Sequence, residues 1–80
     1  MSSTLKKLLI EIQLLCIDIS LKPNGKYFGF LNYAGNVNSI DVFYKEKATG
    51  ELTWICITKS ITLQNLKQIK SKLKKLLEEN

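Results

Sequence analysis

Few residues in this chain could do chemistry, and their types limit what that chemistry could be. The eighty residues include two cysteines, seven carboxylates and twelve lysines, but no histidine and no arginine. The chain therefore lacks the side chain that most often transfers protons near neutral pH. The carboxylates are scattered and form no recognised metal or glycosidase pattern, and the four glycines form no phosphate-binding motif. We expect no catalytic residues, no enzymatic activity and no small-molecule substrate.

The two cysteines, Cys16 and Cys56, lie far apart in the sequence and form no CxxC pair. Both fall in apolar stretches, where burial raises the pKa of a thiol and lowers its reactivity. We interpret them as reduced core residues of a cytoplasmic protein, with no metal and no cofactor. The charged start of the chain does not resemble a secretory leader, and the apolar runs are too short for a membrane span.

Lysines are concentrated near the end of the chain, where residues 59–75 contain six of them and no acidic residue. One interpretation is a phosphate-facing surface that binds RNA or DNA without sequence preference. The other is a solvated face whose lysine stems cover apolar side chains, which the spread of the charges around a helix favours. The absence of arginine argues against reading of specific bases. The nucleic-acid-binding candidates are Lys67, Lys70, Lys72, Lys74 and Lys75.

Helical spacing of apolar residues predicts a first helix over residues 4–21, with Ser3 or Thr4 as its N-cap. A second apolar stripe follows the same segment: Ile10, Leu14, Ile17 and Leu21. A helix in a two-layer domain needs only one buried face. Either this helix contacts something on two sides, or residues 17–21, where apolar residues alternate, form a strand.

Turn-forming residues separate the remaining elements. The pattern predicts strands over residues 27–34, 40–46 and 52–59, joined by short loops into an antiparallel meander. A second helix over residues 62–78 has Thr62 as its N-cap, and residues 78–80 should fray. The predicted fold is one α+β domain, residues 1–80, of order α-β-β-β-α, with both helices on one face of the sheet.

Alternation along the strands assigns residues to the two faces of this sheet. The residues predicted to face the helices are Phe28, Phe30, Ile40, Val42, Ile55 and Ile57. Those predicted to face away are Tyr27, Leu31, Tyr33, Phe43, Trp54 and Cys56. A shift of one residue within a strand would exchange the faces. An outward aromatic face suits a protein interface or the stacking of bases.

Two apolar surfaces thus remain without a partner inside the domain. Together they make up the candidate protein interface: Ile10, Leu14, Ile17, Leu21, Tyr27, Leu31, Tyr33, Phe43 and Trp54. A small domain with more apolar surface than two layers can bury is a candidate homodimer. Our leading hypothesis is a non-enzymatic binding protein that acts through protein contacts and self-association. Nucleic-acid binding through the second helix is the alternative.

Two resemblances bear on these hypotheses. The order of elements resembles that of double-stranded-RNA-binding domains, which carry lysines at the start of their second helix. Here Thr62, Leu63, Gln64 and Asn65 occupy that start, and the lysines come later. Residues 30–42 resemble an aromatic–Gly–His/Asn–Val–Asn segment of small phage and prophage proteins, with Asn36 at the expected histidine. That resemblance implies a bacterial or prophage accessory protein that binds host components, as anti-CRISPR proteins do.

Overall fold

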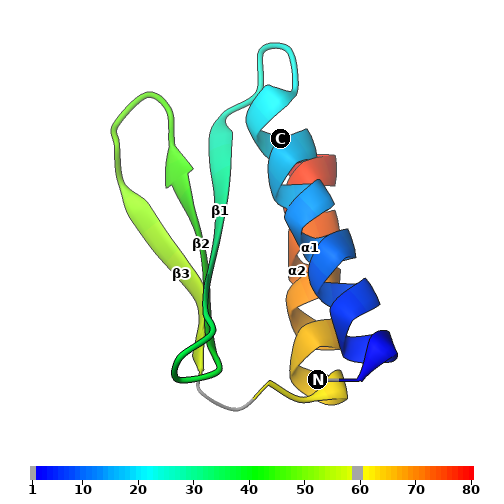
Figure 1. Cartoon of the computed structure of the whole chain (residues 1–80). Helices are drawn as coiled ribbons and strands as arrows, with labels where there is room; N and C mark the ends of the chain where they lie inside the picture. The colour runs from blue at the N-terminus through cyan, green and yellow to red at the C-terminus, as the bar shows by residue number, and fades with distance from the viewer. Residues whose placement is uncertain (1, 59–60) are drawn as a thin grey trace.

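A computed structural model describes residues 2–58 and 61–80 of the chain. The three strands form one antiparallel sheet in the order β1-β2-β3, and both helices lie side by side on one face of it (Figure 1). The predicted α+β fold of order α-β-β-β-α is confirmed. Its elements are α1 (Ser3–Leu21), β1 (Tyr27–Ala34), β2 (Ser39–Glu46), β3 (Leu52–Thr58) and α2 (Leu63–Glu79).

The helix boundaries settle two open points of the sequence. Residues 17–21 belong to α1, so the strand alternative for them is wrong. The N-cap of α1 is Ser2, whose hydroxyl accepts the Leu5 N–H at 3.2 Å, and the helix therefore begins at Ser3. Thr62 caps α2 as predicted, because its hydroxyl accepts the Asn65 N–H at 3.2 Å. Residue 59, the last of the predicted third strand, lies outside the described residues.

The end of the chain is held in place, so the prediction that residues 78–80 fray is wrong. The side-chain oxygen of Asn80 accepts the N–H groups of Lys26 and Tyr27, and its amide donates to the Ile19 carbonyl at 2.9 Å. The Lys22 ammonium donates to the Leu77 carbonyl at 3.1 Å. These bonds connect the ends of both helices to the start of β1. They join residues far apart in sequence, which local patterns do not reveal.

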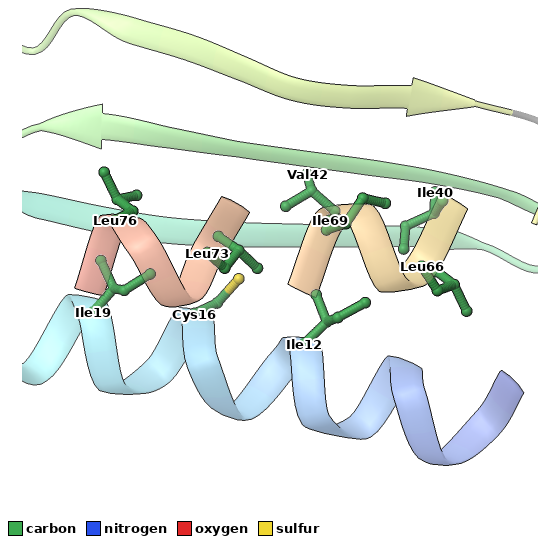
Figure 2. Packing of buried hydrophobic residues seen from close by; sticks show 9 residues of the cluster. All are labelled: Ile12, Cys16, Ile19, Ile40, Val42, Leu66, Ile69, Leu73 and Leu76. Atoms are coloured by element: carbon green, nitrogen blue, oxygen red, sulfur yellow. The ribbon is translucent and has the colours of Figure 1, made fainter. Parts of the chain in front are cut away.

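The core lies between the two helices and the central strand β2 (Figure 2). Side chains from α1 and α2 meet the inward residues of β2, and apolar residues of β1 and β3 pack around them. Burial of this apolar surface is the main force that holds the helices and the sheet together. The buried apolar residues among those described are Ile12, Cys16, Ile19, Ile40, Val42, Leu66, Ile69, Leu73 and Leu76.

Helix α1 runs close along β1 and covers part of its outer edge. The Ser20 hydroxyl accepts the Gly29 N–H at 2.9 Å and donates to the Cys16 carbonyl at 2.8 Å. The Gly29 N–H points away from β2, and Ser20 gives it a hydrogen-bond acceptor within the domain. The edge of β1 is consequently joined to α1 rather than open to another strand.

Candidate interaction surfaces

The face of the sheet turned away from the helices carries three cross-strand rows. Phe30 pairs with Phe43, and Phe43 pairs with Trp54, so the central row is aromatic across all three strands. Residues directly opposite one another on neighbouring strands point to the same face. We call this surface the outer sheet face; its flanking rows are Phe28, Lys45 and Leu52 on one side and Asn32, Asp41 and Ile57 on the other.

The predicted alternation of β1 is wrong by one residue. Phe28 and Phe30, predicted inward, lie on the outer sheet face and are about 40% exposed, at 41% and 38%. Tyr27 and Leu31, predicted outward, pack against the core. The reason is the close approach of α1 to the inward face of β1. A side chain on residue 29 would collide with the Cys16 backbone, so the residue of β1 that faces α1 at this point must be the glycine. With Gly29 inward, the phenylalanines on either side of it must point outward.

Tyr33 was also predicted to belong to the outward surface. Its register partner is the buried Ile40, which puts it on the helix side of the sheet at the end of β1. The side chain is nevertheless exposed, and its hydroxyl donates to the Asn38 side-chain oxygen at 3.1 Å. Tyr33 therefore lies on the helix side of β1, near the loop to β2, and not on the outer sheet face.

Strand β3 changes its alternation at a bulge. Val42 opposes Cys56, but Phe43 opposes Trp54, so the register passes over Ile55. A bulge residue of this kind shifts the alternation of the residues that follow it. Trp54 faces outward as predicted, whereas Ile57 is outward against the prediction, and Cys56 packs against the core instead of facing away. The prediction assumed strict alternation along β3, and strict alternation has no place for the extra residue of a bulge.

The rings of the central row pack against one another. The ring centroids of Phe30 and Phe43 are 4.9 Å apart with 12° between the planes, and those of Phe43 and Trp54 are 4.7 Å apart at 53°. The Phe43 ring therefore has a nearly parallel neighbour in Phe30 and a tilted neighbour in Trp54. Stacking of a base requires a free ring face. The row suits contact with an apolar surface better than contact with bases.

The second apolar stripe of α1 is exposed, as its spacing predicts. Its four side chains are between 41% and 75% exposed. The buried residues of α1, Ile12, Cys16 and Ile19, project from the opposite side of the helix. The stripe therefore lies on the far side of the molecule from the outer sheet face, and one flat contact cannot cover both. It consists of Ile10, Leu14, Ile17 and Leu21.

The lysines of α2 form two groups instead of one row. The first group lies toward α1 and lines a groove of about 300 Å³; it consists of Lys67, Lys70 and Lys74. The second group, Lys72 and Lys75, lies toward β3 and lines a groove of about 360 Å³ together with Trp54 and Ile55. We call the latter the α2–β3 groove. Lys59, the remaining lysine of the sequence cluster, lies outside the described residues.

Lys70 is engaged within the domain. Its ammonium donates to the Glu11 carboxylate, which joins α2 to α1. This hydrogen bond, aided by the positive charges of Lys70, Lys7 and Lys74, holds the pKa of Glu11 below its ordinary value of 4.5. Lys70 is therefore less available to an external phosphate than the sequence indicates.

The Glu11–Lys70 pair leads to a prediction about acid stability. Because the folded-state pKa of Glu11 is lowered, its contribution is present above the ordinary pKa and is lost as pH falls through the folded value. Lys70→Gln should therefore lower the urea midpoint at about pH 7 and have less effect at about pH 3. Lys67→Gln, which removes a nearby lysine without touching Glu11, is the control. An effect of Lys70→Gln that is equal at both pH values would contradict the assignment.

Both cysteines are free. Burial raises the pKa of the Cys16 thiol to about 11, consistent with its place in the core. Burial also raises the pKa of Cys56, although the nearby Lys72 ammonium acts in the opposite direction. Neither thiol has the lowered pKa of a reactive cysteine.

Metal-binding groups and membrane-spanning helices were sought over residues 2–58 and 61–80. In those ranges no three or more cysteine and carboxylate side chains come together as a metal-binding group. Within the same ranges, neither helix has the length and hydropathy needed to cross a bilayer. Comparison with known proteins gave no matching protein-family model, no similar curated protein and no similar solved structure.

Proposed function

We propose that this chain is a non-enzymatic binding protein that self-associates as a two-fold dimer through its outer sheet face. The observation that carries this proposal is the aromatic row of Phe30, Phe43 and Trp54, which crosses all three strands. Both described helices lie on the opposite face of the sheet (Figure 1). An eighty-residue domain buries only about 60% of its unfolded surface, so a second copy adds burial that the single chain lacks.

The size of the outer sheet face suits a reversible dimer. Its partly exposed aromatic and aliphatic side chains offer apolar surface on the order of 500 Å², the range in which patches on monomers mark interaction sites. Two such faces would bury on the order of 1,000 Å² together, near the lower limit for a specific interface. We therefore expect a dimer whose population depends on protein concentration in the micromolar range.

The charges on this face favour one orientation of the two copies. Lys45 and Asp41 lie on β2 on opposite sides of the aromatic row, next to Phe28 and Asn32 respectively. A two-fold axis along the aromatic row would place Lys45 of one copy opposite Asp41 of the other, twice per dimer. A two-fold axis along the strands would instead oppose identical charges. Electrostatic complementarity therefore supports the first arrangement, in which the strands of the two sheets run in opposite directions.

The same face could also receive a different apolar protein. The resemblance of residues 30–42 to phage and prophage proteins supports a bacterial or prophage accessory role, with a host or phage protein as a further partner. Binding of RNA or DNA is the alternative, favoured by the net charge of +5. Against it stand the packing of the Phe43 ring against its two neighbours and the division of the lysines between two grooves. A shift of labelled RNA at low salt that vanishes by about 200 mM salt would favour the alternative.

Sedimentation velocity at tens to hundreds of micromolar chain tests the dimer. We expect wild-type protein to approach twice the chain mass and Phe30→Ser to shift the dimer dissociation constant upward by more than about tenfold. Lys45→Glu and Asp41→Lys should each weaken the dimer, because each opposes like charges. An equimolar mixture of these two variants should restore it, since every opposed pair is then of opposite sign.

Leu14→Ser on α1 is the matched control, because it removes an exposed apolar side chain on the far side of the molecule. It should leave self-association unchanged. Monomeric wild-type protein at the highest concentration would refute the proposal. Dissociation by Leu14→Ser but not by Phe30→Ser would place the contact on α1 instead. Circular dichroism of each variant verifies that the fold is retained.

A further inference from the structure

The two edges of the sheet differ in how their backbone groups are satisfied. At the β1 edge, the Tyr27 N–H donates to Asn80 and the Gly29 N–H donates to Ser20. At the other edge, β3 has β2 as its strand neighbour, and residues 2–58 and 61–80 supply no further strand beyond it. An edge strand whose backbone groups are not covered is a template for pairing with another chain. Of the two, β3 is the edge that is open to a further strand.

The first half of β3 has the geometry for such pairing. The Glu46 N–H donates to the Glu51 carbonyl at 2.9 Å, so Glu46 and Glu51 form a hydrogen-bonded pair at the start of the ladder between β2 and β3. Because antiparallel ladders alternate, the backbone groups of Leu52 and Trp54 then point away from β2. The bulge at Ile55 lies beyond this stretch, so the register here is regular.

The α2–β3 groove lies beside this stretch and is positively charged on one wall. Lys72 and Lys75 come from α2, whereas Trp54, Ile55 and Tyr44 supply apolar and aromatic surface from the sheet. Glu79 is the one acidic residue among the groove residues, so the two lysines outnumber it. The groove volume of about 360 Å³ can hold a few side chains of an extended segment.

We propose that the β3 edge and the α2–β3 groove bind an extended acidic peptide segment of a partner protein, which adds to the sheet as a fourth strand. The peptide backbone would pair with Leu52 and Trp54, and its carboxylates would lie near Lys72 and Lys75. A second copy of this chain fits less well, because β3 paired with β3 would bring the same lysines of both copies together. A nucleic acid backbone has no N–H donors to complete a strand ladder. This inference goes beyond the proposed dimer: it uses the backbone edge of β3 and the α2–β3 groove, and it shares Leu52 and Trp54 with the outer sheet face.

Fluorescence polarisation with a labelled peptide of alternating valine and glutamate, about seven residues long, tests this site. We expect saturable binding to wild-type protein, and Lys72→Glu combined with Lys75→Glu should weaken it by at least about tenfold. Lys67→Glu combined with Lys74→Glu makes the same change of charge on the α1 side of α2 and should have little effect. A peptide of the same sequence with N-methylated valines should bind at least about tenfold more weakly, because it lacks the N–H groups for pairing.

Four results would overturn the proposal. They are no binding by wild-type protein, equal binding of the N-methylated peptide, equal binding of a valine–lysine peptide, and equal weakening by the two double variants. Tighter binding of an oligothymidylate, lost on Lys72→Glu with Lys75→Glu, would assign the groove to phosphate instead. The dimer is tested separately: Phe30→Ser should bind the peptide like wild type, and Lys72→Glu with Lys75→Glu should self-associate like wild type. Failure of one proposal is thus distinguishable from failure of the other.

Discussion

Leu73→Ala is expected to leave a large fraction of the protein unfolded at 25 °C. Leu73 has no exposed surface and lies in the core cluster to which both helices and β2 contribute (Figure 2). Truncation of a buried leucine to alanine costs about 2–5 kcal/mol, because apolar contact is lost and a cavity remains. The core of a domain this small rarely supplies more than about 3–5 kcal/mol of net stability. The loss therefore approaches the whole free energy of unfolding.

Urea unfolding followed by far-ultraviolet circular dichroism measures this effect. Leu63→Ala is the matched control, since Leu63 lies on the same helix but is 41% exposed. We expect its cost to remain below about 1 kcal/mol. If both variants lost the same stability, α2 would not be held by burial of its inner face. A wild-type dimer would add stability at high concentration, so the comparison is made at low micromolar chain.

Local signals in the sequence were sufficient for the elements and their order. The turn residues around Asn24 and Gly50 take positive φ values, 59° and 75°, at positions where the chain reverses. The N-cap role of Thr62 and the helical spacing of the apolar residues in α2 are likewise set by residues close in sequence. Such signals act within a few residues, and the predicted bounds therefore agree closely with the structure. The exceptions, Ser2 as the cap of α1 and Asn80 as a tether, rest on side-chain hydrogen bonds at positions where the sequence pattern is weak.

The faces of the sheet could be predicted only in part. For β2, alternation correctly placed Ile40 and Val42 inward and Phe43 outward. For β1, hydrophobicity alone would bury Phe28 and Phe30, because the other alternating set of this strand contains two tyrosines and a glycine. Contact between α1 and the sheet reverses that assignment, and this contact is not encoded in any single segment.

The candidate interface changes accordingly. Phe43 and Trp54 remain on its sheet part, whereas Tyr27, Leu31 and Tyr33 leave it. Phe28, Phe30 and Ile57 join it. One sequence signal could have found the first of these errors: a glycine at the centre of an aromatic strand often marks a close approach of backbone. The charges of Asp41 and Lys45 gained meaning only when the register put them on opposite sides of one aromatic row.

That close approach of backbone predicts a second large effect, at Gly29. A Cβ atom at this position would lie 2.9 Å from the Cys16 Cα, 3.0 Å from the Cys16 carbonyl oxygen and 3.1 Å from the Cys16 Cβ. Backbone atoms cannot move aside as a flexible side chain can, so α1 itself must shift. Inserting a methyl group into such a contact costs about 1–3 kcal/mol. Gly29→Ala should lower the free energy of unfolding by that amount or more, because the shift also strains the hydrogen bonds of Ser20.

Gly35→Ala separates this contact from the general effect of replacing a glycine. A Cβ atom at Gly35 would lie 3.5 Å from the Tyr33 ring, an ordinary contact distance. Its effect on urea unfolding should therefore be small, and reduced freedom of the unfolded chain could even stabilise it by about 0.4–1 kcal/mol. Hydrogen exchange gives a second readout: in Gly29→Ala the amide of residue 29 should exchange faster, because its acceptor belongs to the displaced helix. If both alanine variants matched wild type in stability and exchange, α1 would be free to move from β1. The outward placement of Phe28 and Phe30 would then have no steric cause.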